Sequence, residues 1–146
     1  MPDNERIGRE LESFYRRYIE IFNRQDTDQL IECFAHPYAA VSGSRGLVPI
    51  ADIDEHQRSF QRGAAALRNR GWARSGIDSI KAWPLTEQLG FIVSDVTRYK
   101  ADDSVLESIR ACYTVCRDRA AWKIVTIAEI RPPFLGPGDI PYPPGR

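Results

Sequence analysis

Residues 91–131 read FIVSDVTRYK ADDSVLESIR ACYTVCRDRA AWKIVTIAEI R, and they contain the clearest fold signal in the chain. Apolar and polar residues alternate along this stretch with a period of two, which is typical of half-buried β-strands. Polar interruptions at residues 101–104 and 118–121 predict tight turns between three long strands. A less regular segment, residues 73–84, predicts a strand that precedes them after a turn near residues 85–88. The stretch therefore predicts an antiparallel meander.

The N-terminal part of the chain predicts helices. Residues 5–24 carry apolar side chains at a spacing of 3.6 residues, which is typical of an amphipathic helix packed on a core. Asp26 suits the N-cap of a short second helix. The sequence His36-Pro37 ends that helix, because the residue before a proline is pushed out of the α-helical region. Residues 38–41 then predict a short strand.

The segment between this strand and the meander predicts a second short strand and a third helix. The strand covers residues 47–50. Asp52, with Glu55 three residues later, is a capping pair at the start of the helix, and Gly71 stops it after about Arg70. Helices followed by an antiparallel meander indicate an α+β fold, with the three N-terminal helices on one face of the sheet.

The length and charge of the chain limit the class of protein. The chain has 146 residues with a formal net charge of zero, which fits one domain at residues 1–131. Residues 132–146 contain six prolines and predict an irregular Pro-rich C-terminal tail. Balanced charge argues against nucleic acid as a partner and against a polybasic membrane anchor. The chain shows no apolar run typical of a signal peptide or a membrane span, so we expect a cytoplasmic protein.

The cysteine and histidine content argues against a metal site. The three cysteines, Cys33, Cys112 and Cys116, are typical of reduced thiols in a cytosolic protein. The spacing of Cys112 and Cys116 matches neither a zinc motif nor a redox motif. The two histidines, His36 and His56, are too few for a histidine-rich site. We therefore expect no metal and no organic cofactor.

Three short segments, taken with the order of the elements, support a family resemblance. They are Asn23-Arg24-Gln25-Asp26 after the first helix, Leu30-Ile31-Glu32-Cys33-Phe34, and Trp122-Lys123-Ile124-Val125 after a charged turn. Over residues 5–131 the chain resembles the nuclear-transport-factor-two-like (SnoaL-like) superfamily. The resemblance implies a cone-shaped fold, in which a curved, mainly antiparallel sheet wraps around three N-terminal helices and leaves a pocket open at one end.

The turns of the meander predict a row of charged side chains across three strands. With the turns centred on residues 102–103 and 120, Asp95 faces Arg110 and Arg110 faces Glu129. An arginine flanked by two carboxylates in a pocket is an arrangement that suits general acid/base catalysis. The alternative is a cross-strand charge ladder on a solvated face. A register slip of one residue would remove the row.

The family resemblance adds a fourth candidate catalytic residue and limits what can be inferred from the Asp95–Arg110–Glu129 row. Tyr18 matches the oxyanion tyrosine of ketosteroid isomerase, a member of the superfamily; the alternative is a core aromatic residue. The two carboxylates of that enzyme fall at Ser42 and Cys112, so its isomerisation is not expected here. Limonene epoxide hydrolase, another member, has an Asp–Arg–Asp cluster that the row resembles in composition only.

The pattern and the resemblance together predict a small-molecule pocket protein. We expect a hydrophobic metabolite as ligand and cofactor-independent acid/base chemistry of the lyase, isomerase or hydrolase type. The alternative is a non-catalytic dimeric ligand-binding or protein-association module. The residues expected to line the pocket are Phe14, His56, Phe60, Val93, Tyr99, Cys112 and Ile127.

The opposite face of the meander predicts an interface. If the catalytic row faces the helices, strand alternation turns a set of apolar residues away from them, and a contiguous exposed apolar patch favours self-association. We therefore expect a homodimer through the convex face of the sheet. The alternative is that the Pro-rich tail from Pro132 folds back over this face. The residues of this expected interface are Ile92, Val96, Ile109, Tyr113, Val115 and Ile124.

Overall fold

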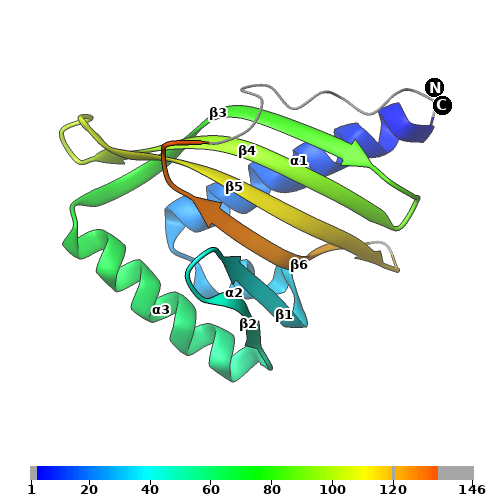
Figure 1. Ribbon diagram of the computed structural model, residues 1–146, viewed down its shortest axis with the longest axis horizontal. Coiled ribbons are helices and arrows are strands. Elements are labelled where there is room, and N and C mark those ends of the chain that lie inside the picture. Colours follow the sequence, from blue (N-terminus) through cyan, green and yellow to red (C-terminus); the bar gives the residue numbers. More distant parts are fainter. Residues whose placement is uncertain (1–2, 120, 135–146) are drawn as a thin grey trace.

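The structure, a computed structural model, describes residues 3–119 and 121–134. Its elements follow the predicted order of helices, short strands, a helix and a meander (Figure 1). The helices are α1 (Asp3–Arg24), α2 (Thr27–Glu32) and α3 (Ile53–Asn69). The strands are β1 (Phe34–Ser42), β2 (Gly46–Ile50), β3 (Trp72–Pro84), β4 (Leu89–Lys100), β5 (Val105–Asp118) and β6 (Ala121–Ile130). Residues 135–146 of the predicted Pro-rich tail lie outside the described residues.

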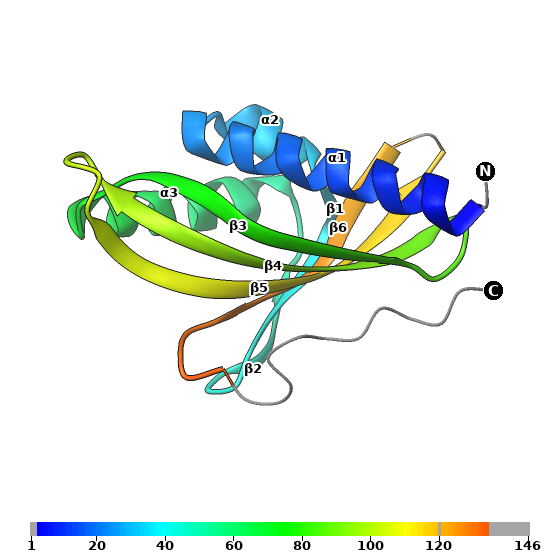
Figure 2. The same cartoon turned by 90° about the horizontal axis from the view of Figure 1, so that it is seen from above.

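The six strands form one curved sheet with the order β2-β1-β6-β5-β4-β3. Neighbouring strands are antiparallel, except that β1 and β6 run parallel. Figure 2 shows the three helices on one side of this sheet. The expected α+β fold with a mainly antiparallel sheet around three helices is therefore confirmed.

The helix ends follow the capping chemistry of the sequence. The Asp26 side chain accepts a hydrogen bond from the Gln29 amide, and Asp52 does the same for the Glu55 amide. The second helix ends before His36, because the Cys33 amide donates to the Leu30 carbonyl and closes the last turn. The first strand therefore starts at Phe34, earlier than predicted.

The core lies between α1 and the sheet, and it corrects the expected assignment of the two sheet faces. Leu11 and Tyr15 of α1 are fully buried, and they belong to one core cluster with Ile92, Tyr113 and Val115. All six residues of the expected dimer face are buried in the described structure: Ile92, Val96, Ile109, Tyr113, Val115 and Ile124. The alternation of side chains separates the two faces of each strand correctly, but the expected inner and outer faces are exchanged. The helices cover the face with the larger apolar area, because burying that area stabilises the fold more.

A bulge in β6 breaks the predicted charged row. Near the β5–β6 turn the register is as expected, with Arg117 opposite Trp122 and Val115 opposite Ile124. The next pair is Thr114 with Thr126, so Val125 is an extra residue in β6. Beyond the bulge every residue of β6 moves to the other face. Arg110 consequently pairs with Ile130 instead of Glu129, and the expected three-strand row does not form.

Candidate functional site

A cavity of about 370 Å³ lies between the three helices and strands β1, β4 and β6 of the sheet. This volume is within the range of roughly 300–1,000 Å³ that is usual for small-molecule sites. Its apolar wall comes from both layers of the fold. The apolar lining residues include Phe22, Leu30, Phe34, Phe60, Leu67 and Ile127.

A pair of histidines stands at one end of the cavity. His56 of α3 lines the cavity, and its Nδ1 lies 2.8 Å from Nε2 of His36 in β1. His56 is 1% exposed and its ring packs against Phe34 and Tyr38, at centroid distances of 4.6 and 4.7 Å. Burial, with the neighbouring His36, lowers the pKa of His56 to about 4. Burial, with the charge of Lys123, also lowers the pKa of His36. Both rings are therefore neutral near pH 7.

Two tyrosines supply hydroxyl groups to the same cavity. Tyr18 of α1 and Tyr38 of β1 both line it. Burial, with the negative charge of Glu55, raises the pKa of Tyr38 to about 12. Burial, with further contributions from neighbours such as Tyr15, raises the pKa of Tyr18 well above its ordinary value. Both groups therefore stay protonated at neutral pH and are able to donate hydrogen bonds to a ligand.

A cluster of arginines and glutamates closes the opposite end. Arg98 of β4, only 6% exposed, donates from Nη1 to Glu107 at 2.7 Å and from Nη2 to Glu129 at 2.6 Å. Arg70, just after α3, donates from both terminal nitrogens to Glu107 at 3.0 and 3.1 Å. Arg131 donates from Nε to Glu107 at 3.3 Å. Arg70, Arg98, Glu129 and Arg131 line the cavity.

The pKa of Glu107 reflects this cluster. Burial would raise the pKa of this carboxyl group, but the hydrogen bonds from Arg70 and Arg98 and the charges of Arg98 and Arg131 lower it to about 2. Glu107 is therefore ionised throughout the neutral range. It holds three arginines together and is not available as a proton donor.

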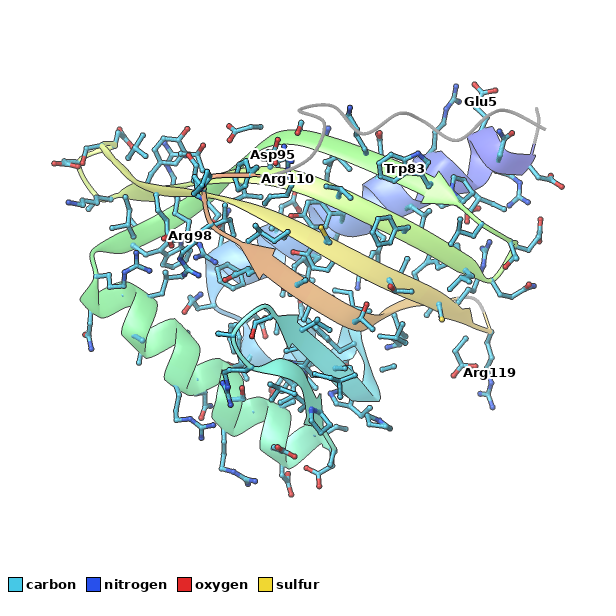
Figure 3. All side chains as sticks on the ribbon, viewed as in Figure 1. Glu5, Trp83, Asp95, Arg98, Arg110 and Arg119 are labelled. Atoms are coloured by element: carbon cyan, nitrogen blue, oxygen red, sulfur yellow. The ribbon has the colours of Figure 1, made fainter. Side chains whose placement is uncertain are left out.

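The structure separates the four predicted catalytic residues. Arg110 donates from Nε and Nη2 to Asp95 at 2.7 and 3.1 Å, so the expected pairing of these two residues is present. The pair lies on the outer face of the sheet, which turns away from the helices, whereas Tyr18 and Glu129 line the cavity. Figure 3 shows Asp95 and Arg110 side by side, with Arg98 nearer to α3.

Of the predicted pocket-lining residues, some line the cavity and the others lie elsewhere. His56, Phe60 and Ile127 line the cavity, where Ile127 arrives because of the β6 bulge. Phe14 lines a separate hollow beside Trp122. Val93, Tyr99 and Cys112 alternate with core residues and lie on the outer face.

Sequence reasoning missed His36 as a partner of His56 and missed Arg98 with Glu107. The second pair was predictable, because the register that places Asp95 opposite Arg110 also places Arg98 opposite Glu107. The histidine pair joins residues 20 positions apart on a strand and a helix, and no local pattern indicates such a contact.

The described residues contain neither a candidate metal site nor a membrane-spanning helix. Residues 3–119 and 121–134 contain no group of three or more His, Cys, Asp or Glu side chains placed to hold a metal ion. No helix in the described part of the chain is long and apolar enough to cross a membrane.

The chain is similar to known proteins in fold. A family model described as "NTF2-like protein (DUF6841)" matches residues 9–132. No curated protein matches the chain. Aln2 from a Streptomyces species superposes with a TM-score of 0.69 at 15% identity, over 90% of this chain and 94% of that chain.

Two further solved structures carry functional names. A putative scytalone dehydratase from Novosphingobium aromaticivorans has a TM-score of 0.63 at 12% identity, over 83% of this chain and 80% of that chain. A putative calcium/calmodulin dependent protein kinase II association domain from Xanthomonas campestris has a TM-score of 0.65 at 11% identity, over 87% and 89%. Identities this low establish the shared fold alone.

Proposed function

This chain belongs to the NTF2-like family DUF6841, and from that premise we propose that it is an enzyme that performs acid/base chemistry on a small, largely apolar molecule in the cone cavity. The observation that supports this proposal is His56, a buried and neutral histidine that is hydrogen-bonded to a second histidine and lines an apolar cavity. Asp95 and Arg110 of the predicted row lie on the outer face, so they are not part of the proposed site.

His56 acts as the general base in this proposal. In the tautomer in which His56 Nδ1–H donates to His36 Nε2, the other nitrogen of His56, Nε2, carries a lone pair. When His56 Nε2 takes a proton from the substrate, the Nδ1 proton passes to His36 Nε2. The positive charge then resides on His36, the less buried of the two rings. The relay keeps a cation out of the apolar cavity, where its desolvation would be costly.

The tyrosine hydroxyls complete the acid/base set. Tyr18 and Tyr38 stay protonated and are able to donate to a carbonyl oxygen as it becomes an enolate. Removal of a proton next to a carbonyl is the first step shared by many isomerases and by lyases that eliminate water. One similar structure is named a putative dehydratase, which agrees with this class.

Hydrogen–deuterium exchange tests the proposal without knowledge of the substrate. The probe is 2-tetralone, a flat apolar ketone with acidic protons next to its carbonyl, followed by NMR in D₂O. We expect the protein to accelerate the exchange, and the rate to fall about a hundredfold or more in His56→Gln, because general-base catalysis typically contributes that much. The pH–rate profile of the wild-type protein should rise as the His36–His56 pair loses its proton, below pH 6.5, because burial lowers the pKa of both rings.

An outer-face variant provides the control. Asp95→Asn should leave the exchange rate unchanged. Loss of exchange in Asp95→Asn with retention in His56→Gln would move the reaction to the outer face and overturn the proposal. Binding of 2-tetralone with no exchange above the buffer rate would support the second candidate, a non-catalytic binding module.

We also propose that the protein is a homodimer through the outer face of the sheet. The three helices lie on the other side of the sheet (Figure 2), and Phe91 and Cys112 are half-buried apolar side chains on this face.

A further inference from the structure

The charged end of the cavity has more cations than anions. Three arginines (Arg70, Arg98 and Arg131) meet two glutamates (Glu107 and Glu129), so the cluster carries one positive charge in excess. The other titratable groups along this cavity, His56 with its partner His36 and the two tyrosines, are neutral at pH 7. An anion of charge minus one would balance the site.

The hydrogen bonds of the cluster show which donors are left for that anion. The Glu107 carboxylate already accepts from Arg70, Arg98 and Arg131. The terminal nitrogens of Arg98 go to Glu107 and Glu129. The two terminal nitrogens of Arg131 make no hydrogen bond or ion pair within residues 3–119 and 121–134.

Arg98 supplies a second free donor. Its Nε is buried and has no hydrogen-bond partner among the described residues, although the side chain lines the cavity. A buried, charged nitrogen without an acceptor destabilises the protein, so a ligand oxygen that reached it would restore a missing hydrogen bond. Two independent observations, a free guanidinium fork and an unsatisfied buried donor, thus occur in one cluster.

Arg131 also has access to a second hollow. A neighbouring cavity of about 430 Å³ shares Tyr38, Ser59, Ile127, Glu129 and Arg131 with the first cavity. The Arg131 side chain is 55% exposed, so it stands at the border between the two spaces. An anion is therefore able to approach Arg131 without displacing the core.

We propose that the ligand of this cavity is a flat, apolar carboxylate, whose carboxylate binds the terminal nitrogens of Arg131 beside Arg98 and whose apolar body lies toward His56. The planar guanidinium fork matches the two oxygens of a carboxylate. Phe22 and Phe60, whose rings meet edge to face at a centroid distance of 5.9 Å, form an aromatic wall between the two ends. This inference rests on the function proposed above for the same cavity.

A matched pair of probes tests it by isothermal titration calorimetry at low salt. 2-Naphthoate carries the carboxylate, and 2-naphthamide is its uncharged analogue of the same shape. We expect the wild-type protein to bind 2-naphthoate at least tenfold more tightly. Arg131→Gln should remove that preference while leaving the affinity for 2-naphthamide unchanged. Arg62→Gln, an exposed arginine on α3 that lines neither cavity, should bind both probes as the wild type does.

The outcomes separate this inference from the proposed function. Equal affinity of the wild type for the two probes would overturn the carboxylate preference and leave the apolar cavity in place. An equal loss of 2-naphthoate binding in Arg62→Gln and Arg131→Gln would show general charge attraction, and would also overturn it. Binding of neither probe, together with no exchange of 2-tetralone, would overturn the proposed function itself.

Discussion

Arg98 and Arg110 lie on neighbouring strands and each forms a short ion pair, but their surroundings differ. The Arg98 side chain is 7% exposed and bridges Glu107 and Glu129 on the inner face. The Arg110 side chain is 14% exposed and pairs with Asp95, which is 34% exposed, on the outer face. An arginine–carboxylate pair therefore contributes differently to the free energy of unfolding at the two positions, because desolvation and screening of the charges depend on burial.

Truncation of the two arginines should show this difference. Arg98→Ala leaves Glu107 without its most buried partner, so we expect a loss of about 3–5 kcal/mol in the free energy of unfolding. Arg110→Ala leaves a carboxylate that water reaches, and we expect a loss of about 1 kcal/mol. Urea unfolding of both variants measures the two losses. Equal losses would contradict the burial argument.

His56 should make the stability of the protein depend on pH. Its pKa is about 4 in the folded state and about 6.5 in the unfolded chain, so the unfolded state binds the proton first as the pH falls. The free energy of unfolding is therefore highest above pH 6.5 and should decrease by about 2–3 kcal/mol between pH 6.5 and pH 4. His36 contributes with the same sign, because burial lowers its pKa too.

Urea unfolding at several pH values between 7 and 5 measures this slope. Glu107 does not disturb the measurement, because its pKa of about 2 confines its own contribution to the range below pH 4.5. The double variant His36→Gln/His56→Gln should show a flat profile in the same range. An unchanged slope in that variant would assign the pH dependence to other groups.

At the scale of the elements, a glycine sets how closely α1 approaches the sheet. A Cβ atom added at Gly90 of β4 would lie 2.6 Å from Cδ1 of Leu11, a fully buried residue of α1. Gly90→Ala should therefore destabilise the protein by about 1–3 kcal/mol through overpacking. In the background of Leu11→Ala the same change should cost much less, because the space is then free.

A thermodynamic double-mutant cycle with chemical denaturation measures this coupling. Gly63→Ala on α3 is the matched control, because nothing lies within 4 Å of its added Cβ atom. It should leave the stability unchanged or raise it by up to about 1 kcal/mol, as expected for alanine in a helix. Additive effects of Gly90→Ala and Leu11→Ala would contradict the close approach.

The strands show which parts of the fold could be predicted from the sequence and which could not. The period-two alternation and the turn residues predicted the meander and placed Asp95 opposite Arg110, as the structure has them. The bulge at Val125 could not be predicted, because nothing in the local sequence distinguishes a bulged valine from a paired one. That one residue moves Glu129 to the inner face, where it meets Arg98 instead of Arg110.

At the scale of the whole molecule, the missing information was which face the helices cover. Alternation gives two candidate faces, and only the packing of α1 against Ile92 and Tyr113 decides between them. The family resemblance predicted the cone correctly, but the expected lining residues Val93, Tyr99 and Cys112 lie on the outer face. The candidate site depended on that choice, so Tyr18, His56, Phe60 and Ile127 line the cavity whereas the charged pair does not.

The corrected faces also change the residues that would form the expected homodimer. The outer face carries Val93 and Cys112 beside the Asp95–Arg110 pair, and the helices lie on the other side (Figure 2). Val93 is already buried, whereas Phe91 and Cys112 are half-buried, so these two side chains supply the apolar surface that favours association with a second copy. Phe134 offers a competing cover, because its ring centroid lies 4.5 Å from Cζ of Arg110.

Sedimentation velocity distinguishes the two covers. We expect a dimer at micromolar concentration, and a monomer for Cys112→Lys, because a charge at the centre of the interface would be buried without a partner. Ala65→Lys on α3, far from the outer face, is the matched control and should remain a dimer. A wild-type monomer would contradict the dimer. In a monomer, the Phe134 ring would cover the Arg110 guanidinium. Phe134→Ala should then expose this guanidinium and lower the melting temperature.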